Sequence, residues 1–187
     1  VYGWFSYVVN ESEGGLYDAQ VDMSFRWGMA WFIFSEIMFF AAFFGALYYA
    51  RELSLPWLAG EGSKVSTNQE LWPTFENVWP SNGPANVGGE FIVMKAAGIP
   101  ALNTIILLIS GLTVTWAHHG LKEGKRNQLI LGLTATVLLG FIFVGFQAYE
   151  YSHAYNDLNL KMTSGMYGST FYMLTGFHGF HVTLGAI

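Results

Sequence analysis

The sequence predicts an all-α protein, a polytopic bundle of about four membrane-spanning helices. Of its 187 residues, 52% are hydrophobic and only 11% are charged, whereas soluble domains carry about 25% charged residues. Four long apolar stretches interrupt the chain, and about 20 apolar residues are enough to cross the hydrocarbon core of a bilayer. We expect spans at residues 27–50, 99–117, 129–149 and 166–187.

The first span, residues 27–50, contains a single formal charge, Glu36. An ionised, unpaired carboxyl group inside a bilayer is costly, so an intramembrane acid marks a candidate functional site. The alternative is that Glu36 only hydrogen-bonds to a neighbouring helix and helps the bundle to pack. Both interpretations stay open, and we take Glu36 as a buried carboxyl group with a role in proton or lipid chemistry.

The segment 51–98 is too polar to span a membrane, and it carries four of the five prolines. Proline fixes φ and removes a backbone donor, so we expect no long regular structure here. Its tryptophans favour anchoring at the membrane interface over substrate docking. They are Trp57, Trp72 and Trp79. The segment is therefore predicted to be a long extramembrane loop.

The span 129–149 carries small side chains at i, i+4 and i+8, namely Gly132, Thr136 and Gly140. Such a stripe lets another helix backbone approach closely. The span 99–117 has no formal charge, and its polar side chains are predicted to hydrogen-bond across helices. These side chains are Asn103, Thr104, Ser110, Thr113 and Thr115.

The basic residues predict how the spans are oriented. The connection 118–128 carries Lys122, Lys125 and Arg126, whereas the connection between the last two spans carries only Lys161. Basic residues concentrate in cytoplasmic or matrix-side loops. We therefore expect the connection 118–128 on the inner side and the loop 51–98 on the outer side.

His178 and His181 lie at i and i+3, on one face of the last span. By helical rise, Glu36 is about 14 Å from the inner boundary, and His178 is about 12 Å from it. We hypothesise that Glu36 meets the two histidines in the bundle, directly or through water. The alternative is that each side chain hydrogen-bonds separately to nearby hydroxyl groups.

Composition argues against several other chemistries. The absence of cysteine excludes thiolate-bound zinc and iron–sulfur clusters, and a net charge of −5 argues against a nucleic-acid partner. The i, i+3 histidine pair has metal-ligand spacing, but the spans 99–117 and 129–149 offer no Asp, Glu or His to complete a site. We predict no catalytic residue, cofactor or metal site in this chain.

Several sequence blocks, in this order, are together specific to one family. They are RWGM at 26–29, FSEIMFF at 34–40, LNT at 102–104, SG at 110–111, TWAHH at 115–119, QAYEY at 147–151 and YGSTFYMLTGFHGFHV at 167–182. The chain resembles subunit III of the haem–copper oxidases, in the cytochrome c oxidase branch. The blocks cover almost its whole length.

The resemblance implies a seven-helix subunit, of which residues 1–187 are a single membrane domain covering about helices three to six. It implies an accessory, non-catalytic subunit of an aa3-type cytochrome c oxidase, the proton-pumping oxidoreductase of the aerobic respiratory chain. Haem and copper are expected in the partner subunits I and II, with subunit I as the main contact. Glu36 matches the family's buried carbodiimide-reactive glutamate.

The resemblance further implies that the chain supports complex stability, phospholipid binding and proton uptake by subunit I. The expected location is the bacterial inner membrane, or the mitochondrial inner membrane if the chain is organellar. One alternative is subunit III of a quinol oxidase. Another is a proton-coupled transporter that uses Glu36, although the chain shows no second buried acid, broken helix or internal repeat.

Overall fold

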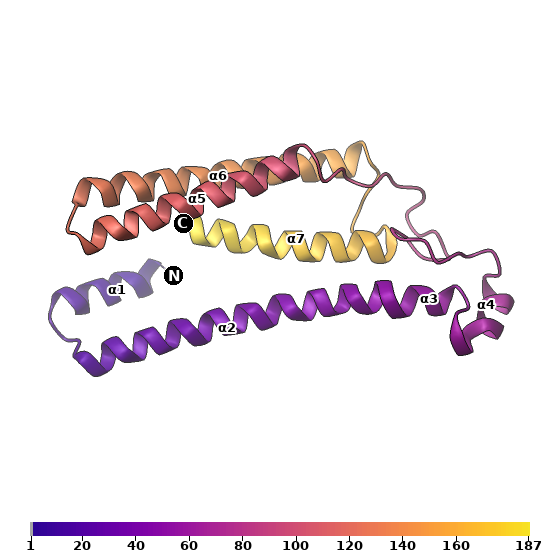
Figure 1. Ribbon diagram of the computed structural model, residues 1–187, viewed down its shortest axis with the longest axis horizontal. Helices are drawn as coiled ribbons and strands as arrows, with labels where there is room; N and C mark the ends of the chain where they lie inside the picture. The colour runs from indigo at the N-terminus through magenta and orange to yellow at the C-terminus, as the bar shows by residue number, and fades with distance from the viewer. Residues whose placement is uncertain (1) are drawn as a thin grey trace. The chain divides into compact units, whose positions relative to one another are not determined.

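The computed structural model describes residues 2–187, which consist of helices and connecting loops without a strand (Figure 1). The chain forms two compact units, one ending at Gly45 and one comprising Ala46–Ile187. Each unit is described on its own. An all-helical fold of this kind confirms the predicted fold class.

The first unit contains α1 (Tyr2–Glu13) and most of α2 (Ala19–Tyr49). The apolar pattern of the sequence does not predict α1, and the predicted first span starts at residue 27. The helix begins earlier because Asp18 caps it: the Val21 amide donates to Asp18 Oδ1 at 2.9 Å. The first turns of α2 are therefore a polar extension of the apolar span.

The predicted loop 51–98 contains only short helices. A π-helical turn (Ala50–Ser54) and α3 (Leu55–Leu58) continue directly from α2, and a 3₁₀ turn (Gly62–Lys64) precedes α4 (Val65–Leu71). The chain then runs without a further helix until α5 begins at Ile99. The proline-rich composition explains why no longer helix forms.

The second unit contains three long helices: α5 (Ile99–Lys122), α6 (Arg126–Asn156) and α7 (Gly165–Ala186). α5 and α6 form an antiparallel hairpin in which they contact each other extensively, and α7 packs on α6 (Figure 1). α5 and α6 are longer than the predicted spans, because each helix includes polar residues beyond its apolar run.

The small-residue stripe of α6 brings α5 close. A Cβ atom added to Gly132 would lie 2.7 Å from Ala117 Cβ and 3.0 Å from the Thr113 carbonyl oxygen. One turn further along α6, Thr136 Oγ1 and Thr113 Oγ1 form a hydrogen bond of 2.7 Å. Glycine is thus required at position 132 for the two backbones to approach this closely.

α7 packs against the C-terminal half of α6. A Cβ atom on Gly140 would lie 3.2 Å from Ala186 Cβ, near the end of α7. Further along, the Tyr151 and Thr175 hydroxyl groups form a hydrogen bond of 2.7 Å. α6 is therefore the central helix of this unit, with α5 and α7 packed on it.

Asn159 ties the connection between α6 and α7 to the end of the long loop. It adopts a left-handed conformation with φ of 49°, and its Nδ2 donates to the Gly88 and Glu90 carbonyl oxygens at 3.1 and 2.9 Å. The Ile92 amide also donates to the Leu158 carbonyl oxygen at 2.9 Å. These bonds hold the end of the long loop beside α6 and α7.

Among the described residues, three helical segments are long and apolar enough to cross a membrane: Ala19–Leu58, Ile99–Lys122 and Arg126–Asn156. Their large apolar side chains are largely exposed, as with Leu112 of α5 at 71%, which suits contact with lipid or with another membrane helix. The fourth expected span, residues 166–187, forms α7, and its crossing of the membrane stays a prediction.

Candidate functional site

Glu36, the candidate carboxyl group predicted from sequence, lies in the middle of α2 and is half-buried. It belongs to a shallow apolar hollow along one face of the helix. The other residues of this hollow are Ile33, Ile37, Phe40, Ala41 and Phe44. The lining of this hollow is therefore apolar, as the sequence of α2 predicts.

His178 and His181, both on α7, have different neighbours. The His178 ring meets the Phe143 ring of α6 edge to face, with centroids 5.7 Å apart. His181 Nδ1 instead lies 2.6 Å from the Phe177 carbonyl oxygen, one helical turn back. Glu36 belongs to one unit and the histidines to the other, so their predicted meeting stays a hypothesis.

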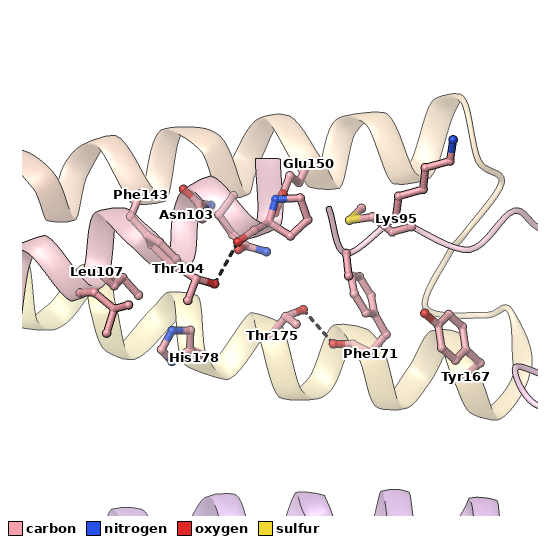
Figure 2. Close-up of a pocket in the computed structure, with 15 residues that line it drawn as sticks. Lys95, Asn103, Thr104, Leu107, Phe143, Glu150, Tyr167, Phe171, Thr175 and His178 are labelled. Atoms are coloured by element: carbon pink, nitrogen blue, oxygen red, sulfur yellow. Dashed lines mark hydrogen bonds between the residues drawn. The ribbon is translucent and has the colours of Figure 1, made fainter. Parts of the chain in front are cut away.

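A cavity of about 620 Å³ lies within the second unit, lined by α5, α6, α7 and the segment just before α5 (Figure 2). α5 contributes Asn103, α6 contributes Glu150, and α7 contributes Thr175 and His178. Lys95 lies at the opposite end of the drawn cavity from Leu107 and His178. Most of the remaining lining is apolar.

Two polar side chains in this cavity are buried and lack hydrogen-bond partners. Asn103 is 3% exposed and Glu150 is 7% exposed, and neither the Asn103 amide atoms nor Glu150 Oε1 has a partner. An unsatisfied buried polar group costs about 1–3 kcal/mol, so each one requires an explanation. The hydroxyl groups nearby do not provide it, because Thr104 and Thr175 donate within their own helices, to Pro100 and Phe171 (Figure 2).

Sequence reasoning missed Glu150. The predicted span ends at residue 149, so Glu150 falls just outside it. In the structure α6 continues to Asn156, and the His153–Asp157 contact of 2.6 Å is an i, i+4 pair on the helix surface. The spacing of Phe143 and Glu150 by seven residues, which places both on one helix face, is the signal that would have identified Glu150 as a cavity residue.

The polar residues predicted for α5 divide into three groups. Thr113 and Ser110 contact α6, as predicted, with the Ser110 hydroxyl 3.4 Å from the Thr136 carbonyl oxygen. Thr115, like Thr104, donates to a carbonyl group of its own helix. Asn103 faces the cavity instead. Within residues 2–187, no group of three or more His, Cys, Asp or Glu side chains is placed to hold a metal ion.

These features define a polytopic helical membrane protein with polar side chains buried between its helices. The chain belongs to the cytochrome c oxidase subunit III family, whose model it matches over residues 1–187. This match confirms the resemblance found in the sequence blocks.

Named relatives agree with this assignment. The chain is 41% identical to cytochrome c oxidase subunit 3 of Chondrus crispus over 190 residues, an alignment that covers 100% of this chain and 59% of the relative. It is 43% identical to the Prototheca wickerhamii protein of the same name, with 100% and 61% covered. For the Pongo abelii protein the identity is 39%, with 100% and 61% covered. The chain therefore spans about 60% of the length of these curated relatives.

Proposed function

We propose that this chain is part of an accessory subunit III in an aa3-type cytochrome c oxidase of aerobic respiration. The observation that carries the proposal is the family match, which extends over every residue of the chain. In this role the chain supports the stability of the complex, binds phospholipid and sustains proton uptake by subunit I. Haem and copper belong to the partner subunits I and II.

The helices of this chain suit a supporting role within a membrane complex. α5 and α6 are joined tightly through Gly132, while large apolar side chains such as Leu112 are exposed, Leu112 at 71%. An exposed apolar helix face in a membrane needs lipid or another helix against it. We place subunit I and bilayer phospholipids on these faces, in the bacterial or mitochondrial inner membrane.

We propose a proton- or lipid-associated role for Glu36, with His178 and His181 as its candidate polar partners. Support comes from the apolar surroundings of Glu36 on α2 and from the similar depths that helical rise gives Glu36 and His178. An acid at this depth is costly without a partner, which favours a histidine or a bridging water beside it.

Purification of the full-length protein through an affinity tag, in mild detergent, tests the proposed function. We expect haem and copper to co-purify and the preparation to oxidise reduced cytochrome c. Oxidation of quinol instead would select the quinol-oxidase alternative. A stable preparation without haem and copper would contradict the oxidase assignment and favour a proton-coupled transporter that uses Glu36.

A further inference from the structure

Polar side chains line the cavity between α5, α6 and α7 from near its mouth to the middle of the helices. We call the end of the second unit where α5 and α7 begin and α6 ends the loop end (Figure 1). By helical rise, the polar lining residues lie at increasing distances from it: Asn103 at about 6 Å, Glu150 at about 9 Å, Gln147 at about 14 Å, Thr175 at about 15 Å and His178 at about 20 Å. Successive groups are therefore no more than about 5 Å apart along the helix axes, a distance that one water molecule with two hydrogen bonds can bridge.

A second space, which we call the side pocket, adjoins the cavity at the loop end and measures about 420 Å³. The two spaces share Glu150 in their lining, together with Lys95 and Pro100, so Glu150 lies between them. The side pocket also reaches His153, whose side chain is 45% exposed. A polar route thus leads from the surface past Glu150 into the cavity.

Water accounts for the unpartnered atoms of Asn103 and Glu150. A buried water molecule typically makes about three hydrogen bonds to otherwise unsatisfied polar groups. One water takes up about 30 Å³ of liquid, so the cavity of about 620 Å³ has ample room. Apolar residues such as Phe143 and Phe171 line its other sides, and hydrating them is unfavourable. Water is therefore expected along the polar side chains rather than throughout the space.

The ionisable groups around Glu150 come from several elements. Lys95 precedes α5, His153 belongs to α6 beside Tyr149, and α7 contributes His178 and Tyr167. In the described part of the chain, α5 adds no ionisable side chain to the lining of either space, and Glu150 is the one acid there. An acid within a membrane bundle typically pairs with another group or faces a water-filled cavity, and Glu150 Oε1 has no partner in the protein.

We propose that water occupies the polar side of the cavity and that Glu150 exchanges its proton with the aqueous phase at the loop end. A hydronium ion in the side pocket gives its proton to the Glu150 carboxylate and becomes water. The carboxylic acid then gives a proton to a water molecule in the cavity, which restores the carboxylate. Proton exchange extends along the polar side chains as far as His178.

This inference goes beyond the proposed function and requires only that the helices of the second unit span a bilayer. Residues 1–187 contain no cysteine, so single cysteines can be introduced into the full-length protein, studied in its complex in membrane vesicles. A small water-soluble methanethiosulfonate reagent is added, and modification of peptides from this chain is followed by mass spectrometry. Haem and copper measured in the same sample report separately on the oxidase assignment.

Thr175→Cys places a thiol in the wall of the cavity. Ile105→Cys is the control, because Ile105 is 53% exposed and does not line the cavity. By helical rise Ile105 lies about 9 Å from the loop end, so it is shallower than Thr175 at about 15 Å. Only the thiolate reacts, and burial in apolar surroundings suppresses it, so we expect Thr175→Cys to be modified about tenfold faster.

Modification of Thr175→Cys no faster than that of Ile105→Cys would overturn the water-filled cavity. If Thr175→Cys does not assemble, Leu107→Cys provides the same comparison, because Leu107 lines the cavity from α5, the helix of the control. A preparation without haem in which the cavity cysteine still reacts faster would support the cavity while the oxidase assignment fails.

Infrared spectroscopy tests the proton exchange of Glu150. At low pH, the carboxylic acid band of a water-accessible group shifts to lower frequency when ordinary water is replaced by heavy water. The difference between wild type and Glu150→Gln should contain one such shifting band. Glu123→Gln is the matched control, because its carboxyl is exposed at the other end of the hairpin, and it should leave this band in place.

A Glu150 band that does not shift in heavy water, or a difference spectrum without a carboxylic acid band, would overturn the proton exchange. If Glu150→Gln does not assemble, Glu150→Asp replaces it. This variant keeps a carboxyl group, so the shifting band should remain but at a changed frequency. An unchanged spectrum in Glu150→Asp would show that the band belongs to another group and would refute the assignment.

Discussion

Replacement of Gly132 by alanine tests whether the close approach of α5 and α6 holds the hairpin together. The new Cβ atom would lie 2.7 Å from Ala117 Cβ and 3.0 Å from both Ala117 Cα and the Thr113 carbonyl oxygen. Two of these three neighbours are backbone atoms, so they cannot rotate away and the helices must separate. Such overpacking costs about 1–3 kcal/mol.

Two further effects modify this cost. Separation of the helices would weaken the Thr113–Thr136 hydrogen bond of 2.7 Å, and interhelical bonds of this kind contribute about 0.6 kcal/mol in a membrane. Alanine in turn favours a helix over glycine by about 1 kcal/mol. The steric cost outweighs this gain, and we expect a net loss of about 1–2 kcal/mol in the free energy of unfolding.

The measurement is reversible unfolding of the full-length protein in mixed micelles, followed by circular dichroism. Gly145→Ala provides the control on the same helix, because a Cβ atom there would meet nothing within 4 Å, and it should be neutral or slightly stabilising. If Gly132→Ala is as stable as Gly145→Ala, the close-packing argument is wrong.

Four other substitutions probe three separate parts of the chain. Glu36→Gln should preserve assembly because the amide still hydrogen-bonds, whereas Glu36→Lys should lower the yield of the complex. Equal yields of the complex from the Lys variant and the wild type would contradict this. Unchanged proton uptake at high pH in the Gln variant would count against proton exchange by Glu36. Asn159→Ala should weaken the attachment of the loop by about 1–3 kcal/mol, because it removes two hydrogen bonds, and faster proteolysis within residues 81–98 would show it. The hydrogen bond and charge of Lys125 lower the pKa of the exposed Glu123 carboxyl. The pair therefore stabilises the fold above the unfolded-state pKa of Glu123, and this stabilisation is lost as pH falls through the folded-state pKa. Lys125→Gln should raise the titration midpoint of Glu123 measured by NMR.

The apolar stretches predict the positions of the long helices well, but not where these helices end. Residue 99 is predicted correctly as the start of α5, where Gly98 has φ of 118° and Pro100 occupies the first turn. At the other ends, hydropathy marks the limit of the apolar run, whereas hydrogen bonding and capping extend the helix beyond it. α1 is missed because its mixture of aromatic and acidic residues forms no apolar span.

The same limit decides which site residues the sequence identifies. Glu36 can be identified from the sequence alone because it is the single charged residue within an apolar run. Glu150 follows directly after an apolar run, where a charge is expected at the membrane surface. Only the packing of α5 and α7 on α6 shows that Glu150 is buried to 7% exposure, and that is a property of three helices together.

Because Glu150 and Asn103 are buried with unpartnered polar atoms, they constrain which kind of group can occupy the cavity of the second unit. Close packing through Gly132 leaves no space between α5 and α6 near their connection, whereas Asn103 of α5 and Glu150 of α6 line the cavity nearer the other end of the unit. Filling that space with an apolar helix would leave both polar groups unsatisfied at a cost of about 1–3 kcal/mol each. An occupant with its own donors and acceptors removes this cost, and this difference favours a polar occupant over a bare apolar surface at the site.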